Sequence, residues 1–159
     1  MIIIYAYINA RFTYEVPGRM KLAEFCIQNG FHAPFFINTT EGMELLLEQN
    51  RDETILLFSN FPPNSSYPEN RRKNPDKSWE ADSYERTGRH FSEWTTRYRF
   101  AAIHIVTGAP ESVLSDESIK GYLPDQKITV IRKGKWAQEG VDYENVFTSY
   151  MIETIRKYC

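Results

Sequence analysis

Short apolar runs alternate with amphipathic segments along the whole chain. The apolar runs predict five strands, at residues 2–9, 33–38, 54–59, 101–107 and 127–133. Three of these runs are almost continuously apolar, within residues 2–8, 55–58 and 103–106. That pattern is typical of strands covered on both faces of a sheet, so we expect a buried parallel sheet.

The segments between the apolar runs carry apolar residues at helical spacing and predict helices at residues 17–28, 41–49, 82–98, 111–122 and 143–158. Pro17 suits a first helical turn, and Asn29 with Gly30 suits a left-handed helix end. Thr40 is the expected N-cap of the second helix. Repeated strand–helix alternation predicts one three-layer, doubly wound α/β domain over residues 1–159, with right-handed crossovers and helices on both faces.

Residues 61–83 interrupt this alternation. They contain four prolines, several Asn and Ser, and a basic run at residues 71–73. The segment is long for a strand–helix connection and reads as an inserted loop, either functional or mobile. It comes after the third strand, at the end where open α/β sheets bind ligands. We interpret the basic run as a solvated loop rather than a nucleic-acid interface.

Composition and charge exclude several classes of protein. A length of 159 residues with 42% hydrophobic and 25% charged residues fits a single soluble domain. The net charge of -2 gives no global attraction to nucleic acid or to an anionic membrane. Cys26 and Cys159 fit no metal-ligand spacing, and the apolar start is too short to span a bilayer. We therefore expect a cytoplasmic protein with reduced thiols, without metal or cofactor, and with no membrane partner.

The order of these elements carries a resemblance. Over residues 19–60, a helix ending at a glycine leads to a short strand, a second helix and an apolar third strand. A fourth apolar run then ends in Thr107 and a fifth in Lys133. The pattern resembles the receiver domain of response regulators. The resemblance implies a flavodoxin-like five-stranded parallel sheet of strand order 2-1-3-4-5, here with a long insertion after strand 3.

The residues that carry receiver chemistry are only partly present. The family uses an acidic pair after strand one to hold Mg²⁺, an Asp after strand three to accept phosphate, and a Thr and a Lys that contact the phosphoryl oxygens. Thr107 and Lys133 match the last two roles. The acceptor position falls on Ser59, four residues before Pro63, and residues 1–14 contain no acid that would bind Mg²⁺. The resemblance therefore implies a pseudo-receiver without Mg-dependent aspartyl phosphorylation.

Two functions remain open. The first is a non-catalytic signalling or interaction domain, which binds a protein partner or a second copy through the face formed by helix 111–122, strand 127–133 and helix 143–158. The second is a small flavodoxin-like enzyme or nucleotide- or phosphate-binding protein, with an anionic ligand at the carboxyl edge of the sheet under residues 61–83. The sequence offers no nucleophile with a base and no matched pair of acids, hence no catalytic residue. The candidate ligand-binding residues are Asn9, Arg11, Ser59, Asn60, Thr107 and Lys133.

Several residues also have a purely structural interpretation. Ser59 and Asn60 suit the cap of a following turn. His104 alternates within an apolar strand and is expected to be a hydrogen-bonded core residue, and the run from Gly88 to His90 falls within a helical pattern rather than a phosphate loop. Trp79 and Trp136 are expected in loops near the carboxyl edge, where they either pack or line a pocket or a partner interface.

Overall fold

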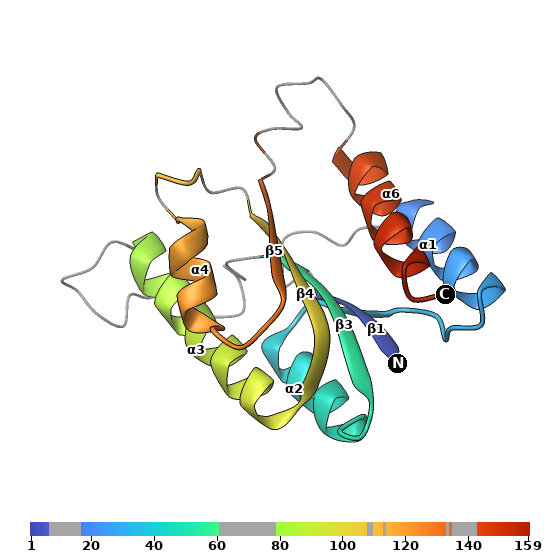
Figure 1. The fold of residues 1–159 in the computed structure, drawn as a ribbon, viewed down its shortest axis with the longest axis horizontal. Helices are drawn as coiled ribbons and strands as arrows, with labels where there is room; N and C mark the ends of the chain where they lie inside the picture. The colour runs from blue at the N-terminus through green and yellow to red at the C-terminus, as the bar shows by residue number, and fades with distance from the viewer. Residues whose placement is uncertain (7–16, 61–78, 108–109, 113, 133, 135–142) are drawn as a thin grey trace.

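A computed structural model of the chain describes residues 1–6, 17–60, 79–107, 110–112, 114–132, 134 and 143–159 (Figure 1). Strands and helices alternate through the described residues. In chain order they are β1 (Ile2–Ala6), α1 (Pro17–Gln28), β2 (Phe35–Ile37), α2 (Thr40–Gln49), β3 (Thr54–Asn60), α3 (Trp79–Arg97), β4 (Arg99–Thr107), α4 (Asp116–Tyr122), β5 (Ile128–Arg132) and α6 (Tyr143–Arg156).

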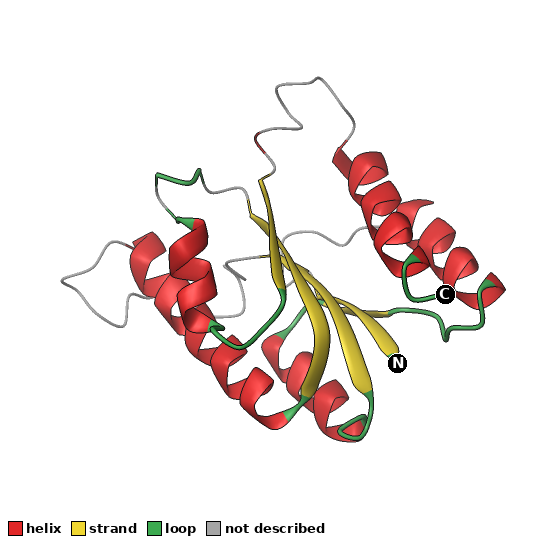
Figure 2. Ribbon diagram, in the orientation of Figure 1, coloured by secondary structure: helices red, strands yellow, loops and turns green. Residues whose placement is uncertain are grey.

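The five strands form one parallel sheet of order β2-β1-β3-β4-β5. This confirms the predicted fold class and strand order. The three strands with neighbours on both sides, β1, β3 and β4, are those with almost continuous apolar sequence. The reason is that residues on both of their faces are covered by helices (Figure 2).

The helices form two layers, with α1 and α6 on one face of the sheet and α2, α3 and α4 on the other (Figure 1). Successive residues along a strand pack alternately against the helices of one layer and of the other. Ile55 and Leu57 belong to the apolar cluster under α2, α3 and α4, whereas Leu56 and Phe58 belong to the cluster under α1 and α6. The predicted three-layer arrangement is thereby confirmed.

Helix α1 spans the predicted residues and ends as expected at a glycine. Gly30 has a φ of 82°, in the left-handed region where a side chain would be strained. Its N–H donates to Ile27 O at 3.2 Å, and the N–H of Phe31 donates to Cys26 O at 2.9 Å. These two bonds satisfy carbonyls that would otherwise be left without partners at the helix end.

Three predicted helix starts were wrong. The N-cap of α2 is Thr39, whose side chain accepts from the N–H of Gly42 at 3.0 Å, while Thr40 is the first helical residue and is buried. Helix α3 begins at Trp79, so this residue is not in a loop and the insertion ends earlier than residue 83. Helix α4 begins at Asp116 rather than residue 111, because Ser115 caps it and accepts from the N–H of Ser118 at 3.1 Å. Trp136 and residues 61–78 lie outside the described residues.

Gly88 lies inside α3, which confirms that the Gly88–His90 run belongs to a helix. A Cβ added at Gly88 would lie 2.4 Å from Cδ1 of Tyr122 on α4. The glycine therefore allows α3 and α4 to approach closely, and this packing accounts for a residue that is otherwise costly in a helix. None of the helices in the described part of the chain is long and apolar enough to cross a membrane.

Candidate functional site

Polar side chains from three neighbouring strands meet at the carboxyl edge of the sheet. The register pairs Ser59 at the end of β3 with Ile105, two residues before Thr107 on β4, and it pairs Thr107 with Arg132 at the end of β5. Because side chains alternate along a strand, Ser59 leaves the sheet on the same face as Leu57, and Thr107 on the same face as Ile105. Both lie on the side of α2, α3 and α4.

The two hydroxyl residues at this edge are enclosed. Ser59 is 2% exposed and Thr107 is 1% exposed, although Thr107 is the last residue of β4 and Ser59 the last but one of β3. Residues in such positions are more often solvated than buried. The enclosure fixes two hydroxyl groups, each able to donate and accept a hydrogen bond, on one face of the sheet.

Arg132 is held at the same edge by an acidic residue of the neighbouring helix. Its Nη2 lies 2.5 Å from Oδ1 of Asp116, and its side chain is 21% exposed. Asp116 begins α4 directly after the cap Ser115, where the helix dipole favours a negative side chain. The pair thus anchors a guanidinium opposite Thr107, at the end of the outermost strand.

The structure brings together two of the six predicted ligand-binding residues, Ser59 and Thr107. The backbone of Asn60 ends β3 and pairs with Val106. The other three candidates, Asn9, Arg11 and Lys133, lie outside the described residues. The turn that Ser59 and Asn60 would cap lies outside them as well. Sequence reasoning missed Arg132, because it selected the next residue, Lys133, as the basic group at the end of the strand. No pattern in the sequence separates the two, since the register with Thr107 decides which of them faces the layer of α2, α3 and α4.

The described groups at this edge are hydrogen-bond donors and hold no carboxylate at the ends of β1 and β3. Hydroxyl and guanidinium groups donate hydrogen bonds to phosphate or carboxylate oxygens. The described end of β1 is Ala6, which pairs with Ser59, so neither of these strand ends presents a carboxylate. No group of three His, Cys, Asp or Glu side chains suited to a metal ion occurs within the residues described.

A second polar contact lies on the other face of the sheet, between β4 and α6. Nδ1 of His104 is 2.6 Å from the hydroxyl of Tyr150, and the imidazole stacks on Phe58 with 5.0 Å between ring centroids. His104 is only 8% exposed, as expected for a hydrogen-bonded core residue. Burial lowers the pKa of His104 to about 4, with smaller contributions from the positive charges of Lys157 and Lys127. The imidazole is therefore neutral at neutral pH.

His90, for which the sequence suggested no partner, faces an acidic residue of the preceding helix. Its Nδ1 lies 3.9 Å from a carboxylate oxygen of Glu44, and its ring lies 5.7 Å from that of Trp94. The contact joins α3 to α2 and becomes an ion pair only when His90 is protonated. It lies away from the carboxyl ends of the strands and supports packing of the two helices.

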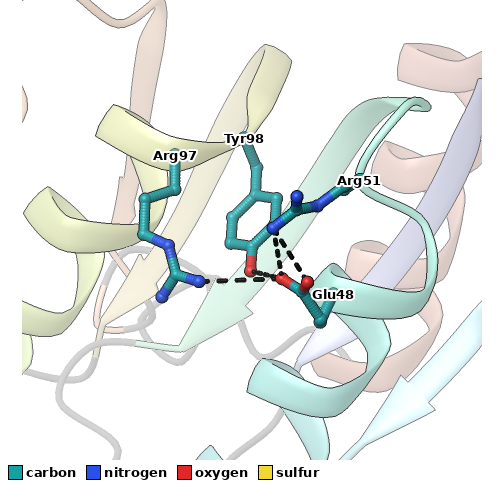
Figure 3. A network of polar contacts seen from close by, with 4 residues as sticks. All are labelled: Glu48, Arg51, Arg97 and Tyr98. Atoms are coloured by element: carbon teal, nitrogen blue, oxygen red, sulfur yellow. Dashed lines mark hydrogen bonds and ion pairs between the residues drawn. The ribbon is translucent and has the colours of Figure 1, made fainter.

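The opposite, amino edge of the sheet carries a network centred on Glu48 (Figure 3). The Glu48 carboxylate accepts from the hydroxyl of Tyr98 at 2.7 Å and lies 2.8 Å from Arg51 and 3.6 Å from Arg97. The Tyr98 hydrogen bond, followed by the contacts with Arg51, lowers the pKa of Glu48. The network joins the last turn of α2 to the end of α3.

Comparison of the chain with protein-family models, with curated proteins and with solved structures found no match. The strand order β2-β1-β3-β4-β5 is that of flavodoxin-like folds, and folds of this kind host many unrelated functions. Function must therefore be argued from the groups at the two sheet edges and from the helices that flank them.

Proposed function

We propose that the chain is a receiver-like signalling domain that works through protein interaction and does not undergo Mg-dependent aspartyl phosphorylation. The observation that carries the proposal is the position of Ser59. It is buried at the end of β3, in register with Ala6 of β1, in the place where the resemblance to receivers would put the acceptor carboxylate.

The chemistry of phosphotransfer supports this proposal. An acyl phosphate forms only on a carboxylate, and the serine hydroxyl of Ser59 offers none. Mg²⁺ prefers carboxylate and carbonyl oxygens, but the sequence of residues 1–14, which includes β1, contains no acid. The acceptor and the metal ligands are thus lost together, while Thr107 remains.

The interaction surface we propose is the face formed by α4, β5 and α6. Strand β5 is an outer strand of the sheet, and its Thr129 is exposed between partly buried neighbours. The hydrogen bond between His104 and Tyr150 connects α6 to β4. A protein partner or a second copy that displaces α6 would thereby act on the strand that ends at Thr107, which is the kind of two-state coupling that signalling domains use.

Arg132 favours a second candidate function, a small flavodoxin-like enzyme or a nucleotide- or phosphate-binding protein. Arg132 pairs in register with Thr107, at the edge where doubly wound sheets hold ligands. In this alternative, an anionic ligand bound there takes the place of a phosphorylated side chain.

Amide NMR spectra test the proposal. Addition of beryllofluoride with Mg²⁺, which mimics an aspartyl phosphate, is expected to leave the amide signals of Ser59 and Thr107 unchanged. Dilution of the protein is expected to shift signals of α4, β5 and α6, if the partner is a second copy. A Thr129→Arg variant, which places a charge in the centre of this face, should remove that dependence on concentration.

Two results would contradict the proposal. A saturable shift at Ser59 and Thr107 with beryllofluoride and Mg²⁺ would show that acceptor chemistry persists. A saturable shift at Ser59, Thr107 and Arg132 with inorganic phosphate alone would favour the alternative, a binding protein for an anionic ligand.

A further inference from the structure

A hollow of about 670 Å³ opens at the amino edge of the sheet, at the opposite end of the strands from Ser59 and Thr107. Four segments line it: the last turn of α3, the first residues of β4, the turn that precedes β5, and Thr54 at the start of β3. Its volume falls within the range of small-molecule sites in proteins. The Glu48 network, drawn in Figure 3, holds Arg97 and Tyr98, and both of these residues also line the hollow.

The hollow exists because β4 extends beyond β5. Strand β4 begins at Arg99, whereas the first residue of β5, Ile128, pairs with Ile103. The register with β3 also skips one residue, passing from Phe100 to Ala102, so that Ala101 forms a bulge. Ala101 therefore pairs in register with neither neighbouring strand, and it lines the hollow. Bulges of this kind are frequent next to functional sites.

The lining is positively charged. Arg97, Arg99 and Lys127 come from the end of α3, the start of β4 and the turn before β5, and among the described lining residues Asp125 alone is negative. This concentration of positive charge contrasts with the net charge of -2 of the whole chain. A site built this way attracts a small anion without making the protein as a whole bind polyanions.

Carboxylates of the protein neutralise the charges of these three residues only in small part. Arg97 shares the single carboxylate of Glu48 with Arg51. Arg99 donates to a neutral acceptor, the backbone carbonyl of Asp52. Lys127 forms no ion pair with any residue that the structure describes. Positive charge thus remains available at the hollow from three separate elements.

We propose that the hollow binds a small organic phosphate, whose dianionic phosphate group is held by Arg97, Arg99 and Lys127. Three cations and one carboxylate leave an excess that matches a doubly charged anion. Guanidinium groups present paired N–H donors in the geometry of phosphate oxygens. The volume exceeds what a phosphate group alone would fill, which leaves room for the organic part of the ligand. The proposal concerns a different edge of the sheet from the proposed receiver-like function and does not depend on it.

Titration of the full chain with AMP, followed by amide NMR, tests this inference. We expect saturable shifts that centre on Arg99, Ala101 and Lys127, and their loss with adenosine, which lacks the phosphate. Inorganic phosphate is the third probe. If AMP binds more tightly than inorganic phosphate, the organic part of the ligand contributes to binding. If the two bind equally, free phosphate is the ligand, and the same three cations hold it.

A double variant, Arg99→Gln with Lys127→Gln, should raise the Kd for AMP about tenfold or more, because two charge-assisted contacts are lost. The matched control is Arg89→Gln with Lys120→Gln, which removes the same charge from two exposed helical residues outside the hollow. The control should bind AMP like the unmodified chain. Since Arg99 also contacts Asp52, the single variant Lys127→Glu tests the site with that contact intact and should weaken binding as well.

Four results would overturn the proposal. They are the absence of saturable shifts up to millimolar AMP, equal shifts with adenosine, equal weakening in the double variant and its control, and shifts centred on Ser59 and Arg132. The last result would move the ligand to the carboxyl edge and support the alternative function there.

Discussion

The two helical layers on the sheet differ in where they place ionisable groups. In the layer of α2, α3 and α4, such groups are paired with one another between the helices: Glu48 with Tyr98, and His90 with Glu44. In the layer of α1 and α6, His104 and Cys26 lie inside the apolar cluster or directly against it. Burial raises the pKa of the Cys26 thiol to about 11 and lowers that of His104, so both are held neutral.

Because of this difference, we expect the stability of the two layers to depend on different factors. The first depends on close packing, including the approach of α3 to α4 at Gly88. The second contains a group whose charge would be costly, so its stability depends on pH. The proposed interaction face draws on both layers, through α4 and α6, and only its α6 side belongs to the layer whose stability depends on pH.

The largest expected effect concerns His104. Its pKa is about 4 in the folded chain and 6.5 when exposed, so between these pH values the unfolded chain binds one more proton. The free energy of unfolding should therefore fall as pH decreases from 6.5 to about 4, by at most roughly 3 kcal/mol from this residue. Urea unfolding at several pH values, compared with a His104→Asn variant, isolates this contribution from that of the carboxylates.

Tyr150→Phe is the matched control for this prediction. It removes the hydrogen bond to His104, together with the contact of the Tyr150 hydroxyl with Thr129, but leaves the imidazole buried. Because burial is the main cause of the shift, the variant should lose about 1 kcal/mol at neutral pH and keep the dependence on pH. If the slope between pH 6.5 and 4 is unchanged in His104→Asn, the comparison between the two layers is wrong.

The next effect concerns packing in the first layer. Gly88→Ala places a methyl group against the ring of Tyr122, and we expect a loss of about 1–2 kcal/mol despite the better helix propensity of alanine. Gly121→Ala is the control, since a Cβ there meets nothing within 4 Å. It should leave the melting temperature unchanged or raise it. Equal melting temperatures for the two variants would argue against close α3–α4 packing.

The smallest effect concerns the Glu48 network of the first layer. Glu48→Gln keeps an acceptor for Tyr98 but removes the charge that Arg51 and Arg97 share. We expect a slight loss of thermal stability that high salt abolishes, because exposed ion pairs are screened. The control Glu153→Gln removes the carboxylate that pairs with Arg156 within α6. A loss in Glu48→Gln no greater than in this control would mean that the network does not join α2 to α3.

The sheet could be predicted because its central strands are apolar on both faces. The continuous apolar run of β3 fits only a strand that is buried on both faces, and the glycine after α1 fits only a helix end. Both predictions are confirmed. Helix starts were harder. Thr39 and Thr40 are adjacent and equally suited to cap a helix, and the extended backbone of Thr39 decides between them. Pro75 is the last proline before α3, yet sequence alone did not show that the helix begins at Trp79.

The polar contacts of the fold were only partly predictable, because they join residues that are distant in the sequence. His104 and Tyr150 are 46 residues apart, and Glu48 and Tyr98 are 50 apart. Ser59 and Thr107 were found because both end apolar runs. Arg132 was missed because the choice between it and Lys133 depends on the register with Thr107, which only the assembled sheet defines.

The strand order also has a consequence for how the chain folds. Each central ladder joins residues far apart in the sequence, such as Ile2 with Ile55 and Thr54 with Arg99. Long chain segments must therefore lose their freedom before β1, β3 and β4 gain any pairing energy. Folding should be slower than in a helical bundle of the same size, with the β1–β3–β4 core as the step that limits the rate.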